Sequence, residues 1–189
     1  AVTEIYIEEG VPVIPNLIFK DLPRVGSVMI PASVTMIGGA AFAGCSNLSS
    51  VVFAKDSELR TIGKYAFYET ALESVVIPAS VTAIRKAAFR YCYNLSSVIF
   101  AGNQKLKEIG EWAFCETSLE SVVIPASVTT IGKAAFTECK RLSSVTFTGD
   151  MNLRTIGAGA FSGTRLHSVM IPSSVATIGE GAFRYCRRL

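Results

Sequence analysis

Four cysteines are the first residues whose type and spacing could support chemistry. They recur at a constant interval of 47 residues: Cys45, Cys92, Cys139 and Cys186. A threonine stands in the same column between them: Thr70, Thr117 and Thr164. A constant interval predicts a straight column, in which neighbouring cysteines lie two repeats or about 10 Å apart. A disulfide needs Cα atoms within about 7 Å, and four zinc ligands must converge on one point. We therefore expect small buried residues that fill space and hydrogen-bond the adjacent coil, with Cys115, outside the column, as a free thiol.

Two other groups of polar residues could carry chemistry. His167 is the only histidine, and no serine or cysteine pattern forms a nucleophile set with it. Its column otherwise holds serine and glutamate, which predicts an exposed position at a rim. Asp56, Asn103 and Asp150 recur in one turn and resemble calcium ligands, but they too are about 10 Å apart, so Asx turns are favoured. The sequence predicts no catalytic residue, no metal and no cofactor, and hence a protein that is not an enzyme.

The elements that position these residues follow a fixed interval. The dipeptide Ala-Phe recurs in steps that alternate between 25 and 22 residues, with its phenylalanine at Phe42, Phe67, Phe89, Phe114, Phe136, Phe161 and Phe183. The true period is therefore 47 residues, made of two related units. Repeats of this length are typical of solenoids, in which each repeat contacts only its neighbours. We expect the phenylalanines to form one buried file.

Each unit contains one predicted strand of about four to five residues. Its inward side chains are β-branched or aromatic and alternate with outward ones, as in Val75 and Ile77 around Val76. Parallel strands of successive units are expected to form one long sheet. An isoleucine follows each link, and glycine follows it in every unit except the one with Arg85, which favours close backbone approach over a left-handed turn. The next residues, up to Ala-Phe, are expected to form one turn of α- or 3₁₀-helix.

The two units differ in the link after the strand. One unit leaves the strand through proline, as at Ile77-Pro78, and the other through a longer turn such as Lys55-Asp56 or Gly149-Asp150. Proline fixes φ and shortens the path, whereas Asx and glycine residues build a wider turn. We call these the proline coils and the wide coils.

The register Val-x-Ile-Pro-x-Ser-Val-Thr-x-Ile-Gly-x-x-Ala-Phe-x-x-Cys-x-x-Leu occurs at 122–142 and, with small changes, at 28–48, 75–95 and 169–189. It resembles the BspA-like (treponemal-type) leucine-rich repeats over essentially the whole chain. The resemblance implies an α/β repeat, a right-handed leucine-rich-repeat solenoid with a parallel sheet on its concave face and short helical or 3₁₀ turns on its convex face. It also implies a cell-surface or secreted binding protein, often an adhesin, without a catalytic motif. Arg85 in place of glycine and Glu108 in place of threonine depart from the pattern.

The ends of the repeat array differ from its middle. Residues 1–26 are expected to form a degenerate, capping-type repeat, because Ile5, Ile14 and Phe19 match the columns of the next unit. Residues 27–189 form the 47-residue double units, and the last repeat is incomplete at Leu189. We expect further repeats in the full-length protein. Mean hydropathy is +0.41, yet no apolar run approaches the 18 or more residues of a membrane span, so none is expected here.

The outward face of the strands is the predicted partner-binding surface. An apolar column is flanked by hydroxyls, and the candidate residues are Tyr6, Met29, Val52, Val76, Ile99, Val123, Thr146, Met170, Ser74, Ser97 and Ser121. Contiguous exposed apolar surface usually marks interaction, although β-branched residues also simply suit strands. The expected partner is a protein, an extracellular-matrix component or a glycan, outside the cell or at its surface, and not a specific nucleic acid. The alternative is a structural spacer or scaffold that associates end to end.

Two surface features leave alternatives open. Net charge is +3, but residues 1–129 carry ten Lys and Arg against twelve Asp and Glu, whereas residues 130–189 carry eight against three. The basic end is either a solvated surface or a contact for glycosaminoglycan, anionic lipid or nucleic acid. Asn47 and Asn94 stand in glycosylation sequons and suit turns equally well.

Overall fold

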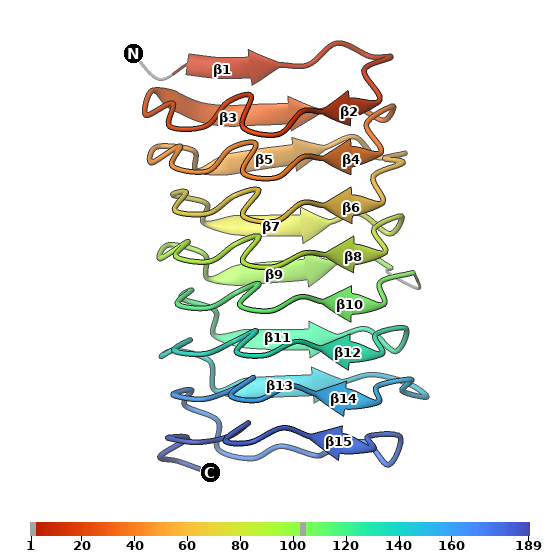
Figure 1. Ribbon diagram of the computed structural model, residues 1–189, viewed down its shortest axis with the longest axis vertical. Helices are drawn as coiled ribbons and strands as arrows, with labels where there is room; N and C mark the ends of the chain where they lie inside the picture. Colours follow the sequence, from red (N-terminus) through yellow and green to blue (C-terminus); the bar gives the residue numbers. More distant parts are fainter. Residues whose placement is uncertain (1–2, 103–104) are drawn as a thin grey trace.

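A single stack of coils makes up the protein (Figure 1). The computed structural model describes residues 3–102 and 105–189, and Asn103 of the predicted Asx column lies outside them. In the described residues, every coil except the last runs through a long strand, a turn, a two-residue strand and a second turn before it enters the next coil; the last coil contains only the two-residue strand. The two ends of the chain lie at opposite ends of the stack.

The long strands carry the alternation predicted from the sequence. Val75 and Ile77 are buried, whereas Val76 between them is 50% exposed. Where successive long strands pair, they are parallel and in register, for example Val75 with Val98 and Val122 with Val145. Seven such strands lie in the described residues: β1 (Thr3–Tyr6), β3 (Val25–Ile30), β5 (Ser50–Phe53), β7 (Ser74–Ile77), β9 (Ser97–Phe100), β11 (Ser121–Ile124) and β13 (Ser144–Phe147).

A second sheet, which the sequence did not predict, is built from the isoleucine column. It is parallel and unbroken over eight strands in the described part of the chain. Ile62, Ile84 and Ile109 are among its fully buried members. Its strands are β2 (Val13–Ile14), β4 (Met36–Ile37), β6 (Thr61–Ile62), β8 (Ala83–Ile84), β10 (Glu108–Ile109), β12 (Thr130–Ile131), β14 (Thr155–Ile156) and β15 (Thr177–Ile178).

The expectation of one continuous sheet of long strands was wrong. Within the described residues these strands form separate groups, β1-β3-β5, β7-β9 and β11-β13. Each break falls where a proline coil follows a wide coil. The wide coils donate a backbone bond to the preceding coil just after the strand, from Ala54 N–H to Ile30 O and from Ala101 N–H to Ile77 O, each at 3.0 Å. Pro78 stands at the equivalent position and has no N–H to donate.

The predicted helical or 3₁₀ turns are also absent, since no helix occurs in residues 3–102 or 105–189. The residue before each Ala-Phe has a left-handed φ, such as 52° at Ala40 and 54° at Trp112. Left-handed residues interrupt a right-handed helix. The backbone instead alternates its bonds: Phe42 N–H donates to Ala66 O in the next coil at 2.8 Å, and Ala43 N–H donates to Ala40 O within its own turn at 3.3 Å. The turns therefore extend the bonding between coils.

The core is a set of straight files, and the phenylalanine file is confirmed. From Phe42 to Phe183 the rings stack with centroids 5.2–5.5 Å apart and interplanar angles of 2–9°. The file also reaches Phe19, at 5.3 Å from Phe42, in the first coil. Six of these side chains have no exposed surface: Phe42, Phe67, Phe89, Phe114, Phe136 and Phe161.

The glycine column permits close approach of neighbouring coils, as predicted. A Cβ on Gly132 would lie 2.6 Å from the backbone nitrogen of Glu111, closer than side chains tolerate, and its φ is not left-handed. Arg85 takes the glycine position in one coil. Its N–H donates to Ile62 O at 3.0 Å, slightly longer than the 2.8 Å of Gly110 to Ile84.

The last predicted strand, around Val169 and Ile171, does not form in the described structure. Just before this segment, Arg165 N–H donates to Leu142 O in the preceding coil at 2.9 Å. Met170 within the segment is 86% exposed.

Candidate binding surfaces

The outward face of the long strands carries the predicted apolar column. The central side chains are half-exposed or more: Tyr6 73%, Met29 53%, Val52 50%, Val76 50%, Ile99 55%, Val123 51% and Met170 86%. Thr146 is the polar member and is exposed. In the flanking hydroxyl column Ser74 and Ser121 are exposed and Ser97 is half-buried. The parallel register brings these residues side by side, as in Val76 with Ile99 and Val123 with Thr146.

Three hollows repeat along this face, a feature that the sequence did not predict. Their volumes are about 700, 500 and 650 Å³. Each contains the phenylalanine of a wide coil, Phe53, Phe100 or Phe147, and the proline of the following coil, Pro78, Pro125 or Pro172. The hollows therefore recur at the 47-residue period.

Each hollow coincides with a break between long strands. The first lies between β5 and β7, and the second lies between β9 and β11. Pro78 and Pro125 follow the strand on one side of these breaks, and the wide turn adds a wall at the strand ends. Pro31 likewise follows β3, which nevertheless pairs with β1, so the proline marks the breaks without being sufficient to cause them.

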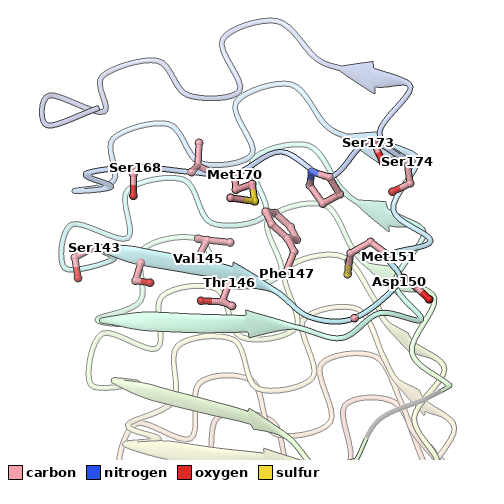
Figure 2. Close-up of a pocket in the computed structure, with 14 residues that line it drawn as sticks. Ser143, Val145, Thr146, Phe147, Asp150, Met151, Ser168, Met170, Ser173 and Ser174 are labelled. Atoms are coloured by element: carbon pink, nitrogen blue, oxygen red, sulfur yellow. The ribbon is translucent and has the colours of Figure 1, made fainter.

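The hollow between β13 and the last coil shows the chemistry of these sites (Figure 2). Phe147, Met151 and Met170 provide an apolar floor between two polar ends. Ser143 and Ser168 lie at one end, and Asp150, Ser173 and Ser174 lie at the other. Apolar surface with a few polar groups around it is typical of sites that bind an extended ligand.

The cysteine column is buried, as predicted, at Cys45, Cys92 and Cys139 and half-buried at Cys186, and its thiols are hydrogen-bonded. Cys92 Sγ lies 3.1 Å from Phe67 O and 3.2 Å from Thr70 Oγ1, both in the preceding coil. Cys139 has the same partners one period later, Phe114 O at 3.1 Å and Thr117 Oγ1 at 3.3 Å. Burial raises the pKa of Cys92 to about 11 and that of Cys139 to about 12. All five cysteines are free, including Cys115.

The remaining polar candidates lie apart from one another. His167 is exposed, and its Nε2 lies 3.1 Å from Arg188 Nη1. Asp56 and Asp150 are exposed in separate wide turns. Within residues 3–102 and 105–189, no three His, Cys, Asp or Glu side chains are grouped to hold a metal ion. In the same residues, no helix is long and apolar enough to cross a membrane.

An aromatic group on the turn edge was missed by the sequence analysis. It consists of Tyr65, Tyr68, Tyr91, Tyr93 and Trp112, from three successive coils. Neighbouring tyrosine rings lie 5.4–5.7 Å apart. The Arg90 guanidinium lies over the rings of Tyr91 and Trp112, at 4.4 and 4.9 Å. Burial, followed by a hydrogen bond to Glu69, raises the pKa of Tyr68 to about 12. Tyr65 and Trp112 replace the alanine or glycine that precedes Ala-Phe in the other coils, and that departure was the available signal.

Parallel strands stacked coil upon coil, with files of leucine, isoleucine and phenylalanine inside, define a leucine-rich-repeat solenoid. The chain belongs to the BspA type leucine-rich repeat family, whose repeat matches in six copies over residues 1–96 and 60–189. No curated protein matches the chain by sequence. The leucine-rich-repeat fold is generally non-enzymatic and serves protein binding.

Solved bacterial proteins share this fold. A leucine-rich repeat protein from Bacteroides ovatus is 27% identical to this chain, with a TM-score of 0.84. The match covers all of this chain and 54% of the B. ovatus chain. The pneumococcal vaccine antigen PcpA is 20% identical with a TM-score of 0.75, covering 98% of this chain and 58% of its own. A leucine-rich cell surface protein from Faecalibacterium prausnitzii is 28% identical, with a TM-score of 0.59. That match covers 98% of this chain and 68% of the F. prausnitzii chain. The chain thus spans little more than half the length of the first two.

Proposed function

We propose that this protein is a cell-surface or secreted recognition module that binds a macromolecule through the outward face of its long strands. The observation that carries the proposal is the row of three hollows along an apolar, serine-flanked surface. Each hollow is as large as a small-molecule site, about 300–1,000 Å³. Extended exposed apolar surface favours interaction over solvation.

The repetition of the hollows favours an extended partner. Successive hollows lie two coils or about 10 Å apart. A polypeptide or glycan chain laid along the stack would present successive groups to successive hollows, and several weak contacts on one linked chain combine into strong binding. The similarity to a cell surface protein of F. prausnitzii supports a location outside the cell. The adhesin function implied by the family resemblance is part of this proposal and would use the same surface.

The test replaces two central residues of this face, Val76→Asp together with Val123→Asp. Both side chains are half-exposed, so the circular dichroism spectrum should be unchanged. Binding to an array of purified matrix proteins and glycans should be lost, because a carboxylate in each strand opposes apolar contact.

The matched control places the same charges on the other sheet, as Thr61→Asp with Thr130→Asp. That outward column already contains an acid, Glu108, in the native chain. The control should bind as the wild type does. Wild-type binding by the Val76→Asp, Val123→Asp variant would refute this face as the binding surface.

A further inference from the structure

The turn that leads into each long strand carries different residues at the two ends of the stack. One or two residues stand between the Cys or Thr column and the leucine that leads into each long strand. In the middle coils they are uncharged: Ser46, Asn47, Ala71, Tyr93, Asn94 and Ser118. In the last three coils every one of them is basic: Lys140, Arg141, Arg165, Arg187 and Arg188. We call these five residues the basic ridge.

The fold does not require charge at these positions, because uncharged residues occupy them in the same backbone geometry. Arg24 is the one other cation at an equivalent position, in the first coil. The ridge is exposed throughout. Asn47 and Asn94 are also exposed, although another coil follows each of them, whereas Ala71 and Ser118, the copies of Arg165, are half-buried. The charges of the basic ridge are therefore not needed to build the coils.

The basic ridge surrounds a concavity of about 790 Å³. Glu138, Gly163, Thr164 and Tyr185 complete its lining. Two carboxylates offset the charge in part: Glu138 Oε2 lies 3.5 Å from Lys140 Nζ, and Glu120 Oε1 lies 3.8 Å from Arg141 Nη1. Arg188 contacts His167, while Arg165 and Arg187 have no ion-pair partner in the part of the chain that the structure describes. Five cations against two carboxylates leave the concavity positive.

The geometry points to a binding site for a sulfated polysaccharide at the basic ridge, separate from the long-strand face. Guanidinium groups form paired hydrogen bonds with the oxygens of sulfate esters and carboxylates. The ridge spans three coils, about 10 Å along the stack, and so presents cations in a row to a linear chain that bears repeated anionic groups.

The residues around the concavity favour a glycan over single-stranded nucleic acid. Proteins that bind single strands stack bases on aromatic rings. Tyr185 is the one aromatic side chain of the lining, and the Arg184 guanidinium lies 4.7 Å from its ring centroid. The ridge thus offers charge without a stacking platform. The ridge also lacks an apolar surface that could insert into an anionic membrane, because its cations surround a concavity. This favours a glycan over a membrane.

The test uses a variant built from residues that other coils already contain: Lys140→Ser, Arg141→Asn and Arg165→Ser. These substitutions copy Ser46, Asn47 and Ser118, so folding should be preserved by circular dichroism. The probe is a size-fractionated heparin oligosaccharide, measured by calorimetry at about 0.15 M salt. Loss of three exposed charge contacts should weaken binding roughly tenfold or more.

A matched control removes three exposed cations from the other edge of the stack: Arg60→Thr, Lys107→Thr and Arg154→Thr. They precede β6, β10 and β14, whose starts lie on the opposite side of the coils from the turns before the long strands (Figure 1). Neighbouring coils have Thr35, Thr82 and Thr129 there. The net charge equals that of the ridge variant, and screening should limit the loss to less than about threefold.

Three outcomes would overturn the inference. They are no binding of heparin by the wild type, equal losses in the ridge variant and the control, or tighter and equally ridge-dependent binding of a single-stranded oligonucleotide or of phosphatidylserine vesicles. The Val76→Asp, Val123→Asp variant should bind heparin normally, which separates this site from the proposed function.

Discussion

Two groups of aromatic residues cross the same coils, one inside the stack and one on its turn edge. The inner phenylalanines lie parallel, within 9° from Phe42 onward, and repeat in every coil. The outer group, from Tyr65 to Trp112, contains edge-on contacts of 62° and 72° and occurs once. Residues two positions apart in the chain, such as Trp112 and Phe114, thus belong to different kinds of structure.

The difference shows what repetition means in this molecule. A side chain that recurs in every coil is held by its copies above and below, and its identity is set by the stack. A side chain that departs from the repeat, such as Trp112 or Arg165, contributes to a surface that exists in one place only. The repeated residues therefore determine the fold, and the residues that depart from the repeat are the ones that can give binding its specificity.

The largest test of this comparison is Phe114→Ala. Removing a ring with no exposed surface from a stacked file should cost about 3–5 kcal/mol of unfolding free energy. The control is Trp112→Ala in the same turn, because alanine already takes this left-handed position at Ala40 and Ala87. It should cost about 1 kcal/mol, mainly the contacts with Lys86 and Arg90. Urea unfolding of both variants gives the comparison, and equal losses would contradict it.

A second test concerns the buried thiols of Cys92 and Cys139. Their pKa values, raised by burial to about 11 and about 12, exceed the ordinary value of 9.0. The folded state therefore binds these protons more tightly than the unfolded state, and this contribution to stability is complete below about pH 9. It is lost as the pH rises through the folded values.

Unfolding free energy should consequently decrease between about pH 9 and 12, more steeply in the wild type than in a Cys92→Ala, Cys139→Ala variant. Denaturant titrations across that range measure the slopes. Parallel slopes would mean that the thiols are not held protonated by the core.

The test with the smallest expected effect asks whether two residues that depart from the repeat stabilise each other on the surface. Arg85 and Glu108, the two departures from the repeat pattern, form an ion pair at 2.9 Å between Arg85 Nη1 and Glu108 Oε2. Both side chains are more than 40% exposed, so their coupling should be about 0.2–1 kcal/mol. A double-mutant cycle with Arg85→Gly and Glu108→Thr, the residues of other coils, measures it. Zero coupling would make the departures independent.

Much of the fold could be predicted because equivalent side chains in the successive coils of a solenoid occupy equivalent environments, so each repeat confirms the assignment of the others. The period of 47 residues correctly placed the long strands up to β13, the phenylalanine file and the buried Cys45, Cys92 and Cys139, but not the last predicted strand around Val169. The helical turns were wrong because left-handed residues such as Ala40 and Trp112 are not marked by residue type. The second sheet was missed because strands of two residues have no alternation to detect.

The candidate sites were predicted less completely. The apolar column on the long strands follows from alternation, but the hollows depend on which successive strands pair. Residue type does not reveal this, because a proline follows both β3, which pairs with the coil before it, and β7, which does not. The basic residues were noticed as an excess of charge, whereas their equivalence to Ser46, Asn47 and Ser118 is clear only from the stacked coils. Likewise, the pairing of Arg85 with Glu108 required knowledge of which residues adjoin across 23 positions of sequence.

The breaks between the long strands have a mechanical consequence. One side of the stack is an eight-stranded ladder without a gap in the described residues, and the other is divided after β5 and after β9. Under a bending load the ladder resists stretching, whereas the divided side can open at its seams. The molecule should therefore flex between the groups β1-β3-β5, β7-β9 and β11-β13, in a direction that widens the hollows. A thicker ligand would then require a more strongly curved stack.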